Sequence, residues 1–387
     1  MWRVGCCLVL GGCALAACGR IDFAELNANG GDAPGSGDGP NGSGFSSLVA
    51  YGDQTCALYK GTAYCWGANN NGQIGDGSNN DAITPSRVLL PAGSVNALSE
   101  GDVSGCAIVD ANLYCWGTPT GPTPTQIPLG APATAVAAGK NFSCVIADMT
   151  RCWGQNDTGQ CGTGSVAPPA TPTSVNFIPA YPATQIDAGD DHACAFAPGQ
   201  PPQCWGHNDS GALGTGSMSP TTSVDPVGVI GGITSLPRIA GWHACGLVGG
   251  TVWCWGEGNS GELGNGMTNN SATPVMVSGL SNVTALETGG GPVDHDASCA
   301  ISGGNVSCWG RGELGRLGNG MTVSESTPVD VLGLPGAATS VAVGFAHGCA
   351  LLVDGDIWCW GRGDRGQLGD GNKTDSMAPV KVVRPTT

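Results

Sequence analysis

The tripeptide Cys-Trp-Gly recurs seven times along the chain, and this repetition restricts the possible folds more than any other feature. Its cysteines stand at positions 65, 115, 152, 204, 254, 308 and 359, at intervals of 50, 37, 52, 50, 54 and 51 residues. A second cysteine, followed by two mostly apolar residues, precedes each tripeptide. A unit of about fifty residues cannot bury its own apolar face, so contacts between neighbouring units must form the core.

Each repeat contains four short β-like segments. A stretch ending in Gly, such as Val341–Gly344, precedes the first cysteine, and a Pro-Val segment such as Pro274–Val277 follows the tripeptide. The 67 glycines and 26 prolines suit a turn-dense all-β chain. Four strands at this period are typical of a propeller blade. We predict an all-β, seven-bladed β-propeller over residues 45–387, with a solenoid as the alternative.

A glycine-rich loop follows the tripeptide in six of the seven repeats. Two glycines three residues apart flank a plug residue, usually Leu or Ile, at 72–75, 159–162, 211–214, 261–264, 315–318 and 366–369. Glycines at fixed offsets indicate positive φ or close approach, and the plug should pack against a neighbouring blade. The third repeat places Cys161 at the plug position, where we expect an inert buried thiol. The second repeat lacks this loop after Gly117, which explains its short interval.

The repeat resembles that of the regulator of chromosome condensation family. The resemblance rests on Cys-Ala-Leu, a hairpin, and then Tyr-Cys-Trp-Gly-x-Asn-x-x-Gly-Gln-Leu/Ile-Gly-Asp-Gly, and it extends over about residues 45–387. It implies a seven-bladed propeller whose ring is closed by strands from both chain ends. Nuclear members are guanine-nucleotide exchange factors that bind chromatin. That function is an alternative here, disfavoured because the chain has an export signal and no basic tail.

Fourteen cysteines form seven pairs on strands that should be neighbours in a hairpin. Opposed residues of such strands lie within disulfide reach, and an exported chain meets oxidising conditions. We therefore predict seven intrablade disulfides, with buried thiols as the alternative. Zinc is disfavoured because structural zinc sites use cysteines two to four residues apart. The predicted pairs are Cys56 with Cys65, Cys106 with Cys115, Cys144 with Cys152, Cys194 with Cys204, Cys245 with Cys254, Cys299 with Cys308, and Cys349 with Cys359.

The N-terminal 44 residues have a different character. Residues 1–17 combine Arg3 with a short apolar stretch, as in a secretory signal peptide. The sequence Leu-Ala-Ala-Cys18-Gly resembles the bacterial lipobox, which implies cleavage before Cys18 and lipidation of that residue. An ordinary signal peptide is the alternative. Residues 18–44, rich in Gly, Asp, Pro and Ser, should form a flexible tether. We expect an exported protein, lipid-anchored at a bacterial outer membrane or cell surface.

The net charge and the lack of catalytic motifs argue against several classes of function. A formal net charge of −16 with only 14 Lys and Arg argues against nucleic acid as a partner. Three G-x-G-x-x-G matches, at 256–261, 310–315 and 361–366, lack the helix that a dinucleotide site requires. Hydrolase, zinc-protease and P-loop motifs are absent from the sequence. We expect no catalytic residue, cofactor or metal. A local basic patch is predicted on repeats six and seven, from Arg311, Arg316, Arg362 and Arg365.

The residues just after each strand-ending glycine vary between repeats and carry many functional groups. By symmetry they should gather on one face of the ring: Phe142, Asp190, Asp191, His192, Trp242, His243, His295, Phe345 and His347. Aromatic anchors in a polar surround are typical of binding hot spots. The alternative is that the histidines form hydrogen bonds within the blades and the aromatic rings pack locally.

These observations favour a monomeric, surface-tethered, non-catalytic binding module that presents a variable loop face to a protein or glycan. An enzyme inhibitor is the more specific form of this hypothesis. A metal-dependent enzyme using His192, His243 and His347 is a further alternative, because rings of histidine over a propeller channel can hold metals.

Overall fold

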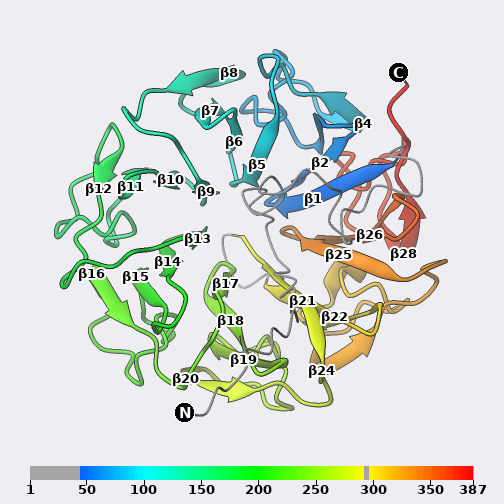
Figure 1. Ribbon diagram of the computed structural model, residues 1–387. Coiled ribbons are helices and arrows are strands. Elements are labelled where there is room, and N and C mark those ends of the chain that lie inside the picture. Colours follow the sequence, from blue (N-terminus) through cyan, green and yellow to red (C-terminus); the bar gives the residue numbers. More distant parts are fainter. Residues whose placement is uncertain (1–43, 292–295, 387) are drawn as a thin grey trace, which may run out of the picture.

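Seven four-stranded antiparallel sheets surround a central axis in the computed structural model, which describes residues 44–291 and 296–386 (Figure 1). In each sheet the strands follow one another in chain order from the centre outward. The predicted seven-bladed β-propeller is therefore confirmed. Among the described residues, no helix has the length and apolar character needed to cross a bilayer.

The strand boundaries follow the sequence repeat. Blades 1 and 2 consist of β1 (Phe45–Tyr51), β2 (Gln54–Tyr59), β3 (Thr62–Gly67), β4 (Ala82–Arg87), β5 (Val95–Glu100), β6 (Ser104–Val109), β7 (Asn112–Gly117) and β8 (Gly121–Ile127). Blades 3 and 4 consist of β9 (Ala135–Ala138), β10 (Phe142–Ile146), β11 (Thr150–Gly154), β12 (Thr173–Ser174), β13 (Gln185–Ala188), β14 (His192–Phe196), β15 (Gln203–His207) and β16 (Thr222–Gly228).

The remaining blades repeat the pattern. Blades 5 and 6 consist of β17 (Arg238–Ile239), β18 (His243–Val248), β19 (Thr251–Gly256), β20 (Ser271–Met276), β21 (Val283–Gly289), β22 (Ala297–Ser302), β23 (Asn305–Gly310), the 3-10 turn η2 (Glu313–Gly315) and β24 (Glu325–Asp330). Blade 7 consists of β25 (Ala338–Val343), β26 (His347–Leu352), β27 (Ile357–Gly361) and β28 (Ser376–Lys381).

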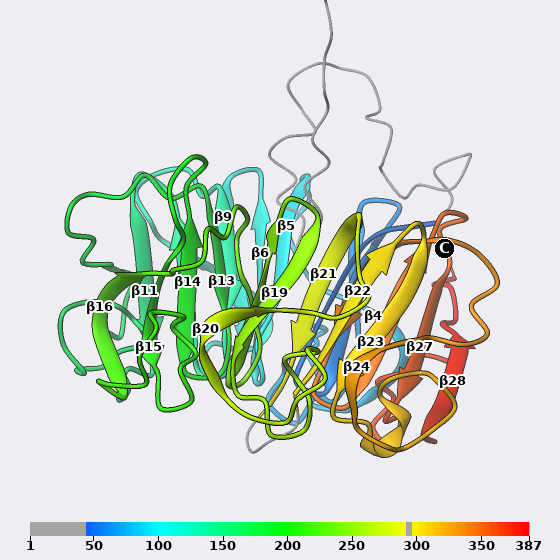
Figure 2. The same cartoon turned by 90° about the horizontal axis from the view of Figure 1, so that it is seen from below.

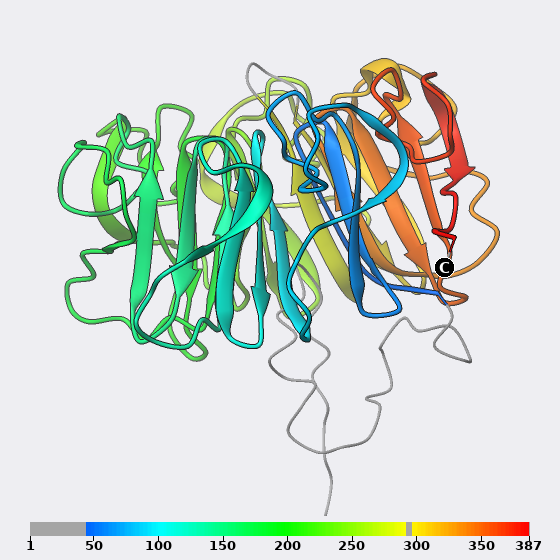
Figure 3. The same cartoon turned by 90° about the horizontal axis from the view of Figure 1, so that it is seen from above.

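The antiparallel order gives the ring two different faces, which Figures 2 and 3 show edge-on. The first-to-second and third-to-fourth connections of every blade lie on one face, which we call the loop face. The third-to-fourth connections, here called anchor loops, span 68–81, 118–120, 155–172, 208–221, 257–270, 311–324 and 362–375. The opposite face carries the second-to-third turns, and the described chain starts there, because the Phe45 N–H donates to the Gly355 carbonyl in such a turn (2.8 Å).

All seven predicted cysteine pairs form intrablade disulfides, as predicted. In each blade the two cysteines stand directly opposite one another on the second and third strands. Their Cα atoms are 4.0–4.1 Å apart in all seven pairs. The constant offset between the two cysteines in the sequence thus reflects the register of one hairpin. From blade 1 to blade 7, the bonds join Cys56 to Cys65, Cys106 to Cys115, Cys144 to Cys152, Cys194 to Cys204, Cys245 to Cys254, Cys299 to Cys308, and Cys349 to Cys359.

In six of the seven blades, the tryptophan of the tripeptide joins the blade to the anchor loop of the blade before it. Six of these indoles are fully buried, and each Nε1–H donates over 2.8–2.9 Å to a carbonyl between the two loop glycines. The Trp116 indole, for example, bonds to the carbonyl of Gln73. The second loop glycine has positive φ, and a Cβ on Gly75 would lie 2.9 Å from the Trp116 ring, so a side chain there would be strained. The plug residues, such as Ile74, are buried as predicted.

Cys161 fills the plug position of blade 3. It is the free cysteine of the described residues and is fully buried. Burial raises the pKa of its thiol to about 12, so the nucleophilic thiolate is scarce near neutral pH. The expectation of a buried plug at this position is confirmed.

The ring closes without a shared sheet. Strands β1–β4 form blade 1 alone and β25–β28 form blade 7 alone, so the expectation that both chain ends contribute to one sheet is wrong. The reason is that the first repeat begins with the innermost strand of its blade, at Phe45, and the last repeat ends with the outermost strand of its blade.

Side chains and backbone groups join blades 7 and 1 instead. The Trp66 indole bonds to the Gln367 carbonyl, and the Phe345 N–H donates to the Gly52 carbonyl (2.6 Å). Arg365 forms a two-pronged ion pair with Asp81, and Arg362 pairs with Asp53 (3.2 Å).

The predicted basic patch is therefore neutralised. Arg316 is buried and donates to the carbonyls of Glu313 and Phe345, while Arg311 pairs with the Glu313 carboxylate (2.8 Å). Together with the ion pairs of Arg362 and Arg365, these contacts give all four arginines a structural role.

Candidate interaction site on the loop face

The first hairpin turns of the blades meet at the centre of the loop face. Their glycines permit close backbone contact between neighbours: a Cβ on Gly101 would collide with the Gly139 carbonyl, and a Cβ on Gly139 with the Gly189 carbonyl. The residues that follow these glycines include the predicted partner-binding residues. The structure places them in two groups, one buried in the hub of the ring and one accessible.

The three histidines belong to the buried group and are unavailable to a partner. His347 Nε2 lies 2.7 Å from the Thr55 hydroxyl, and His243 Nε2 lies 2.7 Å from the Ser298 hydroxyl, each across a seam between blades. The assignment of His243 and His347 to the partner face is wrong, because a hydroxyl of the neighbouring blade meets each ring. The alternative of internal hydrogen bonding is right for these two residues.

His192 is buried in the corresponding seam between blades 4 and 5. The residue equivalent to Thr55 and Ser298 is Ala244 there, and neither ring nitrogen has a hydrogen-bond partner among the described residues. Burial lowers the pKa of both His192 and His347 to about 3, so both rings stay neutral. His192 is thus a packing residue and not a contact for a partner.

The predicted contacts Phe142 and Asp190 are also buried. The Tyr51 hydroxyl donates to Asp190 Oδ1 over 2.6 Å, joining blade 1 to blade 4, and Lys140 Nζ lies 3.9 Å from Oδ2. Burial, with a smaller contribution from the nearby Asp296, raises the pKa of Asp190 to about 7 against the opposing effects of Tyr51 and Lys140. Asp190 therefore links blades 1 and 4 at the hub and does not face a partner.

Trp242, Asp191 and Phe345 remain accessible as half-buried side chains. The Trp242 ring meets the His207 ring edge-on with centroids 5.1 Å apart, and His207 Nε2 lies 3.1 Å from Asp209 Oδ1. We call Trp242, His207, Asp209 and Asp191 the Trp242 cluster. Phe345 lies apart from it, in blade 7.

The backbone holds the Trp242 cluster in place. The Trp242 N–H donates to buried Asp296 Oδ2 (2.9 Å), and its carbonyl accepts from the Ser210 hydroxyl (3.1 Å). Asp191 is held in the same way, since its carbonyl accepts from the Thr158 hydroxyl (3.1 Å). The turn of one blade is thus bonded to the anchor loop of the blade before it, and the cluster sits on a rigid support.

Sequence reasoning missed His207 and Asp209, which lie at the end of β15 and in the next anchor loop. The available signal was strand alternation, because four antiparallel strands bring the first-to-second turn and the anchor loop to the same face. Two residues singled out from the sequence, Cys18 and His295, lie outside the described residues.

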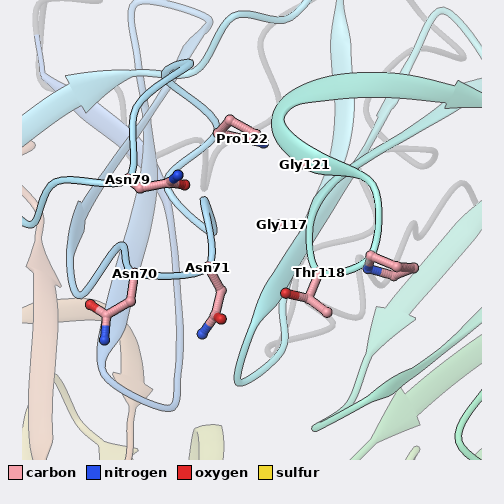
Figure 4. A pocket seen from close by; sticks show the side chains of 8 residues that line it. Asn70, Asn71, Asn79, Gly117, Thr118, Gly121 and Pro122 are labelled. Carbon is pink, nitrogen blue, oxygen red and sulfur yellow. The ribbon is translucent and has the colours of Figure 1, made fainter.

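A second feature of the loop face is a hollow beside blade 2, whose anchor loop is only three residues long. The hollow measures about 360 Å³ and is drawn in Figure 4. Asn70, Asn71 and Asn79 of the first anchor loop stand on one side of it and the turn around Thr118 on the other. We call this region the loop gap; its lining is Asn70, Asn71, Asn79, Gly117, Thr118, Pro119, Gly121 and Pro122.

Metal binding has little support in the described part of the chain. The one group there that brings three potential ligand atoms together is Cys56, Cys65 and Glu100. Its two sulfurs form a disulfide and are not thiolates, so one carboxylate is left. The histidines of the metal-enzyme alternative are locked into different seams, which removes the geometric basis for that alternative.

Comparisons with known proteins agree with this fold. The model of the regulator of chromosome condensation (RCC1) repeat matches residues 60–103, 152–196, 249–291, 303–351 and 354–387. The E3 ubiquitin-protein ligase HERC2 of Mus musculus is 27% identical over 349 residues, which are 84% of this chain and 7% of that protein. The ultraviolet-B receptor UVR8 of Arabidopsis thaliana is 28% identical over 252 residues, which are 64% of this chain and 46% of the receptor.

A solved structure extends the similarity to most of the chain. The crystal structure of Prp20p from Saccharomyces cerevisiae matches with a TM-score of 0.74 and 18% identity, over 87% of each chain. At this identity the likeness shows the fold alone. The present chain also spans less than half the length of the two curated relatives, so their named activities do not carry over with the repeat.

Proposed function

Because this chain belongs to the RCC1-repeat family, whose propellers serve as binding and regulatory modules, we propose that it is a non-catalytic binding module that contacts a protein through the Trp242 cluster. The single observation that carries this proposal is the cluster itself. A half-exposed indole lies beside the His207 imidazole, which pairs with the Asp209 carboxylate and whose backbone N–H donates to the Asp191 carbonyl. Hydrogen bonds to neighbouring blades fix the support of this cluster.

The chemistry of the cluster indicates what it would bind. Tryptophan is enriched at hot spots, and its ring face attracts cations. Asp191 and Asp209 supply negative charge at the cluster, in a chain whose formal net charge is −16. A basic or aromatic side chain of a partner protein would find complementary charge and apolar area here. Prp20p, a fold relative with binding properties to Gsp1p and histones, is an example of such a propeller that binds proteins.

The proposal includes attachment to a membrane through lipidated Cys18 at a bacterial cell surface or outer membrane. The described chain begins at Gly44, on the face opposite the Trp242 cluster. A tether ending there would direct the loop face away from the lipid. Mass spectrometry of the mature N-terminus tests this part, since an unmodified Cys18 contradicts it.

Affinity capture tests the interaction face. The full chain should retain a discrete partner protein, and Trp242→Ala should weaken its binding by about 2 kcal/mol or more, as at other hot spots. Phe345→Ala, on a separate blade, tests how far the face extends. Met276→Ala is the matched control, because Met276 is exposed on an outer strand away from the cluster. Equal capture by the Trp242 variant and the control contradicts the proposed face.

A further inference from the structure

The seam between blades 2 and 3 lacks a part that the other six seams all contain. At each of those six, the anchor loop of one blade supplies a carbonyl to the tryptophan of the next, inserts an apolar plug, and donates an N–H from its third glycine to the next outer strand. The last contact is, for example, Gly216 N–H to the Ala272 carbonyl (2.9 Å). The anchor loop of blade 2 is only residues 118–120 and lacks the glycines and the plug, so blade 3 receives none of these contacts.

The consequences are visible in the residues that the missing loop would cover. Trp153 is half-buried, while its six equivalents are fully buried, and no described group accepts a hydrogen bond from its indole N–H. Cys115 is 5% exposed, whereas the other thirteen disulfide cysteines are 0% exposed. Trp153, Ile127 and Leu129 are partly buried and pack against the same core cluster, which contains Cys115. The seam between blades 2 and 3 thus has an apolar surface and an indole N–H donor, but it lacks the loop that covers both in the other six seams.

We propose that this seam is a docking seat for a glycine-flanked aliphatic loop of a partner protein, which completes the seventh seam from outside. The incoming loop would accept the Trp153 N–H through a backbone carbonyl and place a Leu or Ile side chain against Cys115 and Ile127. It would reach this seam from the loop face, where the anchor loop of blade 2 is only three residues long.

The choice of occupant follows from the six filled seats. In this chain the seat accepts Gly-x-Leu-Gly or Gly-x-Ile-Gly in five seams and Gly-Gln-Cys-Gly in one. The residues that would receive the loop, Cys115, Ile127 and Trp153, are apolar apart from the indole N–H, which fits an aliphatic side chain beside a backbone carbonyl better than a phosphate or a cation. The chain's own six loops are each engaged with the following tryptophan, so a second copy cannot supply one without opening its ring.

The test uses the full chain and a head-to-tail cyclised peptide of residues 68–81, the anchor loop of blade 1. With the tryptophans labelled at the indole nitrogen, the peptide should shift the Trp153 N–H resonance in a saturable manner; Trp153→Phe identifies that resonance. The control peptide carries Ile74→Asp and should bind at least tenfold more weakly. No saturable shift at millimolar peptide, or an equal shift with the control peptide, would overturn the proposal.

A second variant tests the same seat without a peptide. Residues 118–120 are replaced by a copy of residues 68–81, which restores a seventh anchor loop. This variant should show the shifted Trp153 resonance on its own and should no longer respond to the peptide. A folded variant whose Trp153 resonance stays at the wild-type position contradicts the proposal. Concentration-dependent self-association of the wild-type chain through this seam contradicts it as well. The inference deepens the proposed function, but a failed capture by the Trp242 cluster would leave the peptide result intact.

Discussion

At the scale of single residues, Asp190 shows how the hub of the ring couples charge to stability. Its carboxyl group is buried at the centre, bonded to a tyrosine 139 residues away, and lies close to Asp296. Burial raises its pKa to about 7, well above the 3.8 of an exposed aspartate. The folded state therefore binds a proton that the unfolded chain releases between about pH 4 and pH 7.

We expect Asp190→Asn to remove a loss of folding stability that grows as the pH rises. Below about pH 4 the carboxyl is protonated in both states, and its contribution to stability is fully present. As the pH rises towards 7 this contribution is lost, because only the unfolded chain has ionised. At pH 8 the variant should be more stable than wild type by on the order of 2–4 kcal/mol, with little difference at pH 4.

Denaturant unfolding at a series of pH values measures this difference. Asp330→Asn, which changes an exposed carboxylate on the outer strand β24, is the control and should give a curve parallel to that of wild type. Parallel curves for Asp190→Asn as well would show that Asp190 does not carry the pH dependence.

At the scale of elements, the anchor loop stabilises the ring more than its lack of regular structure suggests. One loop places its plug in the core of a seam, accepts the indole N–H of the next blade and bonds to that blade's outer strand. Its glycines are needed because the loop turns at positive φ directly against the indole. The disulfide of each blade fixes the hairpin that carries this tryptophan.

Leu317→Ala should lower the free energy of unfolding by about 2–5 kcal/mol, because it leaves a cavity beside the Trp360 indole. Leu332→Ala is the matched control in the same blade, since Leu332 is 56% exposed and should change stability by no more than about 0.5 kcal/mol. Denaturant unfolding with the disulfides intact provides the comparison. Similar losses for the two leucines would contradict the structural role of the plug.

At the scale of the whole molecule, the ring depends on side chains to join its ends. Blades 7 and 1 come from opposite ends of the described chain and share no strand. The Arg365–Asp81 and Arg362–Asp53 pairs and the Trp66 bond to Gln367 span that seam on the loop face. Both charged pairs are partly exposed, so salt should weaken them.

Arg365→Met should reduce stability by about 0.5–1 kcal/mol at low salt and by less at high salt. It should also speed hydrogen exchange at the seam, for example at the Gly371 N–H that bonds to the Ile83 carbonyl. Arg311→Met is the control, because Arg311 pairs with Glu313 within its own loop. If exchange at the seam rises equally in both variants, the ion pair does not close the ring.

The sequence alone determined the features that local spacing controls. The number of blades, the four strands of each, the cysteine pairing and the buried plug, including Cys161, all follow from residues at constant offsets within one repeat. These contacts lie within a hairpin or between adjacent repeats, so periodicity reveals them. The loss of the anchor loop in blade 2 was also readable, as a short interval. The lipid anchor at Cys18 remains a prediction.

Only the tertiary structure decided which loop residues face solvent. His243 and His347 are buried because the next blade places a hydroxyl opposite each ring, and Asp190 is buried because Tyr51 reaches it across the hub. The partner in each case is distant in the sequence, and a repeat pattern carries no information about it. The same holds for the ring closure, for the His207 ring beside Trp242, and for the uncovered Trp153. The tryptophan of Cys-Trp-Gly is identical in all seven repeats, yet the loop that precedes it in space determines whether it is buried.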